Sequence, residues 1–431
     1  MNKKIFTNDT QFQKPDLEKK RHNQERKLIL FDLSIYGHHP AYIQYLVQYW
    51  CEQELPGSLD IIVSPRFLQV HAEVVDTALS YGQKNVNFVE IAPAEEAALK
   101  PRNSIISRTH RAWQEWQLLC KYVDCLGANH CLIMYFDPYQ LPLALGIKTP
   151  CPFSGIYFRP TFHYHELANY EPKLKERIQQ WRERLLISQI VNHPQLQNLF
   201  CLDPFAIAPL AQFCRHSQAI HLPDPVPSVS CSLEEITKLK FRLSVEPQRQ
   251  VFLLFGALTK RKGIYQVLEA VRLLPSFLCQ HLCILMVGQV DRGVKTQVES
   301  LVADLHQETP IQIIRHYQFV SETEVSHYFQ LADVVLATYQ RHVGMSGILL
   351  LAAAAQKPVL ADSYGLMGEI TRQHQLGLTV DATKAAEIAQ GITQILSNPE
   401  AIGDRNQMKQ MKQFAAQNSP QRFARTILQH I

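Results

Sequence analysis

Short apolar runs alternate with longer amphipathic stretches along most of this chain of 431 residues. In its first half, the strand-like runs are 27–33, 59–65, 86–91, 130–137, 153–158 and 198–203. Segments with helical spacing separate these runs, notably 101–123 and 169–188. Because strands that alternate with helices build parallel sheets with covered faces, the pattern predicts an α/β fold.

The alternation stops once and then begins again. The segment "HLPDPVPSVS" (221–230) is rich in proline, which marks a linker. After it, strands and helices alternate from "QVFLLFGAL" to a last helix, "PQRFARTILQHI". We therefore predict two Rossmann-like, doubly wound domains that face a cleft. Ligands of such sheets bind at the carboxyl ends of the strands, so the cleft is the expected small-molecule site.

This reading divides the chain into five segments. They are a disordered polar tail (1–26), an N-terminal domain (27–222), a linker region (223–249), a C-terminal domain (250–415) and a C-terminal helix (416–431). One option for the last helix is to pack back on the N-terminal domain. The tail lacks the apolar core of a secretion signal, and no apolar run reaches the roughly 18–20 residues of a membrane span.

Charge and cysteine usage narrow the function classes. A formal net charge of +4 and the lack of a basic run interleaved with aromatics argue against a nucleic-acid binder. Cys131, Cys201 and Cys283 stand in strand-like apolar runs, as buried reduced thiols do, which indicates the cytoplasm. Cys120 and Cys125 form no C-x-x-C pair with each other or with Cys131, so we expect no zinc site there.

Three segments of the second half carry candidate ligand-binding residues. "FGALTKRKGI" (255–264) leads from a strand to a basic loop and a helix start, which suits a diphosphate, although a solvated basic loop is the alternative. "MVGQVDRG" (286–293) ends a strand on a glycine. "VGMSGILLLAAAAQKPVLADSYGLMGE" (343–369) opens with small residues at a helix start; its apolar part is core and its leading edge is the expected site.

In this order and spacing, these segments resemble the group 1 (family 4) glycosyltransferases of GT-B fold. The matching positions are Gly256, Lys262, Gly263, "VLEA" at 267–270, Val287, Gly288, Leu349, Leu350, Ala352, Ala354, Pro358, Val359, Ala361, Gly365 and Glu369. The resemblance covers about residues 250–400 and is thin in the N-terminal half. It implies a hexosyltransferase that uses a nucleotide-sugar donor, retains the anomeric configuration and needs neither a metal nor a cofactor.

The resemblance also implies which residues bind the donor. These are Gly256, Arg261, Lys262, Gly288, Gly344, Ser346, Gly347 and Glu369. The family's E-x(7)-E acids, however, fall on Val343 and Leu351, and Ala257 replaces the arginine of "G-R-L". A charge-assisted hydrogen bond from a ribose hydroxyl to such a carboxylate would be worth ~1.5–3 kcal/mol. The chain is then either a divergent enzyme or an inactive GT-B protein that binds a sugar, a nucleotide or a protein partner.

The N-terminal half offers the acceptor side. In "DLSIYGHHPAYIQYL" (32–46), Gly37, His38 and His39 match the placement of the family's cleft-facing loop. Each histidine could bond a phosphate or an acceptor hydroxyl, or simply pack or cap. Asp137 could orient an acceptor hydroxyl or cap a helix, and Arg159 could pair with a phosphate or form a surface ion pair. His39, Asp137 and Arg159 are the candidate catalytic residues.

Two basic segments that contain tryptophan, 101–123 and 169–188, could rest on an anionic membrane or be ordinary solvated helix faces. The prediction is a cytoplasmic protein, with peripheral contact to the inner membrane face as an option. The sequence leaves the acceptor open among a polysaccharide, a lipid and a small molecule. No Asp-x-Asp motif occurs in a loop where a metal-bound diphosphate would need one.

Overall fold

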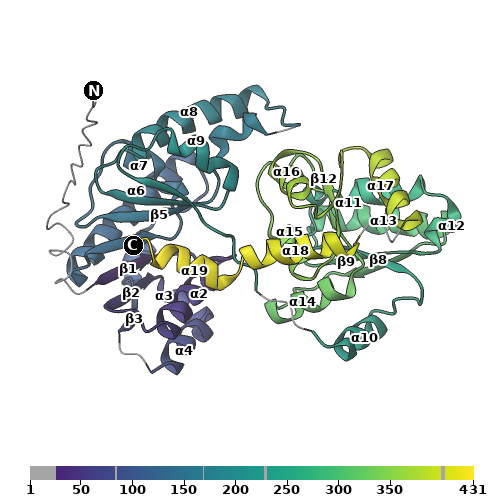
Figure 1. Ribbon diagram of the computed structural model, residues 1–431, viewed down its shortest axis with the longest axis horizontal. Coiled ribbons are helices and arrows are strands. Elements are labelled where there is room, and N and C mark those ends of the chain that lie inside the picture. The colour runs from purple at the N-terminus through teal and green to yellow at the C-terminus, as the bar shows by residue number, and fades with distance from the viewer. Residues whose placement is uncertain (1–25, 83–84, 168, 228–230, 399–402) are drawn as a thin grey trace, which may run out of the picture.

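The computed structural model describes residues 26–82, 85–167, 169–227, 231–398 and 403–431. Most of the sequence-predicted tail, 1–26, therefore lies outside the described residues. Two parallel sheets with helices on both faces form two domains side by side (Figure 1). The predicted fold class, two doubly wound α/β domains, is confirmed.

The N-terminal domain holds a seven-stranded parallel sheet with the order β3-β2-β1-β4-β5-β6-β7. Its strands are β1 (Lys27–Phe31), β2 (Ser58–Val63), β3 (Val86–Glu90), β4 (His130–Ile133), β5 (Phe153–Tyr157), β6 (Leu196–Cys201) and β7 (Gln218–His221). Its helices are α2 (His39–Glu52), α3 (Pro65–Val70), α4 (Ala72–Ser80), α5 (Pro93–Ala98), α6 (Ile105–Leu126), α7 (Gln140–Ala144), α8 (Leu174–Ile190) and α9 (Ile207–Ala211), with 3-10 turns η2 (Asp137–Tyr139), η3 (Thr161–Glu166) and η4 (Pro204–Ala206).

The C-terminal domain holds a six-stranded parallel sheet with the order β10-β9-β8-β11-β12-β13. Its strands are β8 (Gln250–Phe255), β9 (Leu282–Val287), β10 (Gln312–His316), β11 (Val334–Ala337), β12 (Val359–Asp362) and β13 (Gly377–Val380). Its helices are α10 (Leu233–Arg242), α11 (Ile264–Arg272), α12 (Ser276–Cys279), α13 (Arg292–Glu308), α14 (Glu322–Leu331), α15 (Gly347–Ala354), α16 (Gly365–Gln373), α17 (Ala385–Ser397) and α18 (Arg405–Gln417), with the 3-10 turn η5 (Lys260–Lys262).

Strand β1 shows why the strands of this fold read as unbroken apolar runs. Leu28 and Leu30 belong to one buried cluster, whereas Ile29 and Phe31 belong to another. Successive side chains of a strand point to opposite faces of its sheet. Since helices cover both faces, every position of the strand can be apolar.

Two strand predictions needed correction. The run 130–137 was expected to be one strand, but β4 ends at Ile133 and the chain turns at Phe136 into η2, where Pro138 follows. The sequence analysis also predicted neither of the edge strands β7 and β13; β7 is partly exposed and lacks apolar alternation.

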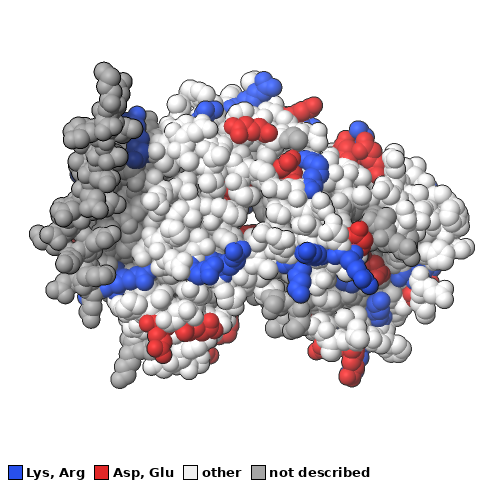
Figure 2. All heavy atoms as spheres, in the orientation of Figure 1, with Lys and Arg blue, Asp and Glu red and all other residues white. Residues whose placement is uncertain are grey.

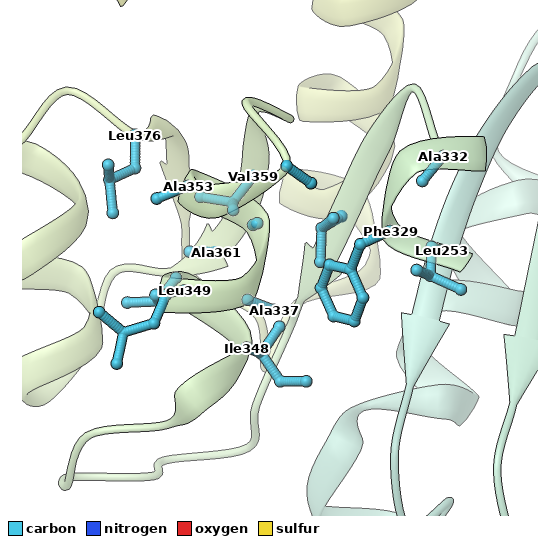
Figure 3. Close-up of a cluster of buried hydrophobic side chains, with 14 of the residues drawn as sticks. Leu253, Phe329, Ala332, Ala337, Ile348, Leu349, Ala353, Val359, Ala361 and Leu376 are labelled. Atoms are coloured by element: carbon cyan, nitrogen blue, oxygen red, sulfur yellow. The ribbon is translucent and has the colours of Figure 1, made fainter. Parts of the chain in front are cut away.

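Helix α15 confirms that the apolar part of the 343–369 segment is core. Leu349, Leu350 and Ala352 are buried in a cluster that also contains β8, β11 and β12 side chains. The close-up shows Ile348, Leu349 and Ala353 among side chains from neighbouring elements (Figure 3). The small alanines allow the helix to lie close to the sheet. Its first turn is thereby fixed relative to the ends of β8 and β11.

The end of the chain joins the two domains. Helix α18 contributes Met411 and Phe414 to a C-terminal core cluster, whereas α19 (Pro420–Leu428) contributes Phe423 and Ile427 to an N-terminal one. The Phe423 ring lies 4.6 Å from the ring of Tyr42 on α2. In Figure 1 the yellow helices run from one domain to the other.

The domains also touch beside the cleft. Tyr164 and Leu167, at the end of η3, are buried in a cluster of the C-terminal domain. The ring of Tyr170 lies 5.4 Å from that of Tyr364. These contacts place the carboxyl ends of the two sheets opposite each other.

Candidate functional site

A cleft of about 640 Å³ lies between the domains. Its N-terminal wall includes His38, Tyr42, Phe158, Arg159, Thr161, Tyr164 and Tyr170, and its C-terminal wall includes Arg261, Arg341, His342 and residues 343–347. His38 follows β1, Phe158 and Arg159 follow β5, and the C-terminal wall follows β8 and β11. The cleft therefore occupies the ligand position that two parallel sheets create at their carboxyl ends.

Of the predicted site residues, the cleft brings together His38, Arg159, Arg261, Gly344, Ser346 and Gly347. The remaining ones, Gly37, His39, Asp137, Gly256, Lys262, Gly288 and Glu369, do not line it. Gly37 has a φ of +68° in the turn before α2, and an added Cβ there would meet nothing within 4 Å.

Gly256 and Gly288 allow two loops to approach each other closely. Their φ angles are +101° and +127°, and a Cβ on Gly288 would lie 2.2 Å from the Gly256 carbonyl oxygen. A side chain at Gly288 would therefore separate the loops that follow β8 and β9. Both glycines therefore allow close packing of the loops next to the site, and neither lines the cleft.

Lys262 lies beneath the C-terminal wall. Its side chain is buried, and its Nζ donates to the Phe255 carbonyl and to the Tyr339 hydroxyl, both at 2.6 Å. The Tyr339 hydroxyl lies 2.8 Å from the hydroxyl of Ser346, which caps α15 by accepting from the Ile348 amide. A chain of hydrogen bonds thus links the buried lysine to a hydroxyl at the cleft surface.

Burial, followed by the nearby charge of Arg261, lowers the pKa of Lys262 from 10.5 to about 7. Among the described residues, no carboxylate compensates the ammonium, because its two partners are a carbonyl and a phenol. An anionic ligand above Ser346 would supply the missing negative charge. This perturbed amine beside a cleft is what a functional site commonly shows.

Exposed Arg261 and half-buried His342 lie over that lysine. Arg261 donates through Nη1 to His342 Nδ1 at 3.3 Å, and its guanidinium lies 5.3 Å from the centre of the Tyr339 ring. Burial and then Arg261 lower the pKa of His342 to about 4. The imidazole is therefore neutral at pH 7, with Nδ1 accepting and Nε2 donating to the Met345 carbonyl at 3.4 Å.

Arg341 connects the two walls. Its φ is +47°, in the left-handed region, and its guanidinium lies 5.1 Å from the centre of the Tyr364 ring. It donates to the carbonyl of Glu171 in the N-terminal domain at 3.1 Å. A non-glycine residue in this conformation at a cleft edge is a frequent mark of function.

The two predicted histidines have different roles. His38 faces the cleft, and its ring stacks on Phe158 at 4.8 Å. Burial by these surroundings, then the charges of His39 and Arg159, lower the pKa of His38 to about 4, so it is neutral at pH 7. His39 points its Nδ1 at the Asp32 carboxylate, 2.6 Å away, and stacks on His38 at 4.9 Å. His39 therefore packs against His38 without lining the cleft itself.

Asp137 is placed differently from the catalytic prediction. Its carboxylate accepts the backbone amides of Phe158 and Arg159 at 2.9 and 3.0 Å, so it holds the end of β5. Burial raises its pKa to about 7. The capping alternative does not describe it either, since the N-cap of η2 is Phe136. Asp137 therefore positions Arg159, which does line the cleft.

Glu369 does not line the cleft. It lies on α16 and forms an ion pair with Arg372 at 2.8 Å, one helical turn away. The two positions where the resembling family has acids hold apolar side chains in different surroundings. Val343 lines the cleft, whereas Leu351 packs partly buried against the core.

Three carboxylates line the cleft among the described residues, and each already accepts a hydrogen bond. Glu176 accepts the Lys173 amide at 2.7 Å, Asp203 pairs with buried His163 at 2.8 Å, and Asp224 accepts from Tyr42 at 2.5 Å. The three cleft arginines make no ion pair with them. The arrangement favours anionic ligands, and its fixed cations and helix start could stabilise a leaving phosphate.

Sequence reasoning missed Tyr339, Arg341 and His342. A signal existed, because all three directly follow β11 (Val334–Ala337) and the carboxyl ends of parallel strands meet at the site. The site predicted from the sequence instead begins at residue 343, where the family pattern begins.

The sequence profile of the family "Glycosyl transferases group 1" matches residues 235–417. Among solved structures, sucrose-phosphate synthase from Thermosynechococcus elongatus superposes with a TM-score of 0.67 at 14% identity, covering 94% of this chain and 98% of that one. HepE from Anabaena, in complex with UDP and glucose, superposes with a TM-score of 0.62 at 12% identity, covering 94% and 98%. A glycosyltransferase from Rickettsia africae gives 0.64 at 14%, covering 94% and 97%. These structures show the GT-B fold.

No curated protein matches the chain in sequence. In the described ranges, no helix is long and apolar enough to cross a membrane. Both domains carry side chains of both signs on the face shown in Figure 2, so the described residues there form no single basic surface of the kind that tracks a nucleic acid.

Proposed function

We propose that this chain, which has the GT-B fold and matches the group 1 glycosyltransferase family at residues 235–417, moves a sugar from a nucleotide-diphosphate sugar to an acceptor held in the interdomain cleft. The observation that carries the donor half is the layered cation site of Arg261 above buried Lys262, linked through Tyr339 to Ser346. Solved structures of similar fold include HepE bound to UDP and to UDP-glucose.

The donor diphosphate would lie against Arg261 and the first turn of α15. Ser346 offers a hydroxyl there, and Gly347 leaves the helix start open. Helix starts attract anions through free N–H groups and the helix dipole. In this proposal neither a metal nor a cofactor takes part in the transfer, because fixed cations and dipoles stabilise the departing diphosphate. Retention of configuration follows the resembling family.

The acceptor would enter along the N-terminal wall. Neutral His38 can exchange hydrogen bonds with a hydroxyl, and the rings of Phe158 and Tyr170 offer apolar faces. Asp137 fixes the backbone of Arg159, so this arginine can orient an acceptor group without moving the strand. Arg341 would complete the site by holding the walls together.

The ribose would lack its acidic partner, because Val343 and Leu351 replace the acids. The compensation we propose is stronger contact with the diphosphate. Each of the three cleft carboxylates is held by a protein group, and none forms an ion pair with a cleft arginine, so the arginines are available to the diphosphate. The alternative, an inactive sugar-binding GT-B protein, would leave the unpaired arginines and the uncompensated lysine without a ligand.

A thermal-shift screen with nucleoside diphosphates and nucleotide sugars tests the donor site. A ligand at ~100 times its dissociation constant adds ~2.7 kcal/mol of stability. We expect one nucleotide to raise the melting temperature of the wild type and to lose this effect in Arg261→Ala. Lys260→Ala, in the same loop and exposed, is the matched control and keeps it. If no nucleotide raises the melting temperature of the wild type, the donor-site assignment is wrong. If Arg261→Ala shows no such rise but still releases the diphosphate from a donor sugar, the diphosphate binds elsewhere.

Helix α8 supports the predicted membrane contact. Leu174, Ile178, Trp181 and Leu185 are 46–75% exposed, and their spacing places them in one narrow stripe. Lys175 and Arg182 flank the stripe on one side, and Arg177 and Arg184 on the other. Glu183 on the opposite face is buried. An apolar stripe between basic flanks fits an anionic bilayer surface.

The same helix lines the cleft through Glu176, Gln179 and Gln180. A helix lying on a bilayer would therefore bring the cleft close to lipid-linked acceptors, and a lipid-linked acceptor is the one we favour. The other predicted segment, 101–123, does not share these features. Trp116 on α6 is buried, and the exposed apolar side chains of α6 are Ile105 and Ile106 at its start.

Vesicle flotation tests this contact. The wild type should float with vesicles that contain phosphatidylglycerol and stay unbound with pure phosphatidylcholine. Ile178→Ser combined with Trp181→Ser should abolish flotation. Leu233→Ser with Phe241→Ser removes two even more exposed apolar side chains from α10 and should change nothing. Equal flotation of both double variants would contradict a role for α8.

A further inference from the structure

Three metal-ligating side chains meet on the C-terminal domain, where α10 and α14 lie side by side (Figure 1). They are Cys231, Glu235 and His327, and one ligand atom of each lies within 4.8 Å of the other two. None of them lines the interdomain cleft. They come from separate elements: Cys231 precedes α10, Glu235 is in its first turn, and His327 is on α14.

The capping of α10 fixes one carboxylate oxygen and leaves the other available. Glu235 Oε2 accepts the backbone amide and the hydroxyl of Ser232, both at 2.8 Å. Its Oε1 faces His327 Nε2 at 4.0 Å, which is too long for a hydrogen bond. The Cys231 thiol makes a weak 3.7 Å contact with the Ser232 carbonyl. The three side chains thus face one another, and the hydrogen bond that acts among them is the one between the Cys231 thiol and the Glu235 carboxyl.

The charges of the cluster favour a cation. The Glu235 carboxylate lies beside His327 and the Cys231 thiol, and among the described residues none of the three forms an ion pair with a lysine or arginine. A thiolate beside a carboxylate is unfavourable unless a positive charge lies between them. A metal ion would supply that charge and displace the thiol proton.

We propose that Cys231, Glu235 and His327 bind one divalent zinc-like cation, with a water molecule in the remaining position. Thiolate, imidazole and carboxylate together are ligands that suit Zn²⁺, and three protein ligands leave a tetrahedral position open. With metal–ligand bonds of ~2.0–2.3 Å, neighbouring ligand atoms lie ~3.3–3.8 Å apart. The observed spacing needs only side-chain rotation to reach this, because none of the three is fully buried.

Such an ion would fasten the entry of the chain into the C-terminal domain. Cys231 is the first described residue after the proline-rich linker, and His327 lies on the helix that carries Tyr328 and Phe329. The Phe329 ring lies 5.2 Å from the ring of Phe255, whose carbonyl accepts from Lys262. The ion would therefore stabilise α14, which packs behind the C-terminal wall of the cleft. This role is independent of the transfer reaction itself.

Titration of the metal-free full chain with Co²⁺ tests the site, because a cobalt–thiolate bond gives a characteristic near-ultraviolet band. We expect one equivalent to bind with this band and to be displaced by Zn²⁺. Cys231→Ser should lose the band, and His327→Ala should bind at least ~10-fold more weakly, as loss of one ligand or its support commonly does. Cys125→Ser, which removes an exposed thiol outside the cluster, should behave as the wild type.

A second measurement avoids substitutions at the site. In the wild type, Zn²⁺ should slow the alkylation of Cys231, located by peptide mass spectrometry, while Cys125 reacts at an unchanged rate. The proposal is overturned if no thiolate band forms in the wild type, or if Cys231→Ser keeps it. Equal protection of Cys231 and Cys125, or of neither, would overturn it as well.

Discussion

Replacing Lys262 with methionine separates the contribution of this lysine to ligand affinity from its effect on the stability of the fold. The side chain is only 5% exposed, and burial lowers its pKa from 10.5 to about 7. A difference of this size corresponds to roughly 4 kcal/mol of unfavourable free energy for the folded state at pH 7. Methionine is similar in length and has no charge, so it relieves this cost. It also loses two hydrogen bonds, at ~1 kcal/mol each.

We therefore expect Lys262→Met to unfold with a free energy ~2 kcal/mol higher than the wild type at pH 7. Between about pH 7 and 10.5, the unfolded chain holds a proton on this lysine that the folded chain does not. The unfolding free energy of the wild type consequently gains a rising contribution with pH in this window, and the variant lacks it. The stability difference between the two proteins should shrink as pH rises. Urea unfolding at several pH values measures it, at constant m.

The same variant should bind the donor nucleotide less tightly. The ammonium acts on Ser346 through Tyr339, and loss of a charge-assisted hydrogen bond costs ~1.5 kcal/mol, or about tenfold in affinity. Lys260→Met, exposed in the same loop, should change neither stability nor affinity. A Lys262→Met variant that is less stable and binds the nucleotide as well as the wild type would refute both halves of the reasoning.

Three further changes test the fold and the support of the site. Between about pH 4 and 7, the folded wild type keeps a proton on Asp137 that the unfolded chain has lost, so this residue makes the unfolding free energy fall as pH rises. Asp137→Asn should abolish this contribution. Urea unfolding at several pH values measures the change. Phe423→Ala should lower the unfolding free energy by ~3–5 kcal/mol, since the ring is fully buried, while Met408→Ala on exposed α18 surface should change it little. Tyr339→Phe should weaken nucleotide binding by ~1 kcal/mol, and this loss should not add to that of Ser346→Ala in a double-mutant cycle, because both changes break one hydrogen-bond chain.

The sequence was sufficient for the fold because the fold rests on local pattern. The residues of β1 are apolar on both faces, the proline-rich linker separates the two sheets, and the glycine-led loops after β8 and β9 fall where strands end. Each of these signals is readable within a few residues. Strand β7 was not predicted, because an edge strand with exposed faces has no apolar periodicity.

The site was harder to predict because its residues act through tertiary surroundings. Lys262 reads as an exposed cation in "TKRKG" but is buried, and only the packed structure shows its pKa and its partner Tyr339. Asp137 sits at a strand end, as a catalytic acid would, yet its carboxylate is used by backbone amides. The pairing of Glu369 with Arg372 was readable, because residues three apart face each other on a helix.

The missing acids and the buried lysine lead to one more expectation. A diphosphate above Ser346 would bring negative charge to Lys262, whose pKa of about 7 leaves it about half protonated at pH 7. Binding should raise that pKa and take up about half a proton at pH 7, so affinity should fall above pH 7 by up to ~10-fold per pH unit. Neutral His342, with a pKa of about 4, cannot supply this proton dependence. Calorimetric titration in two buffers with different ionisation enthalpies measures the uptake. Its absence in the wild type, or its persistence in Lys262→Met, would show that the diphosphate does not sense this lysine.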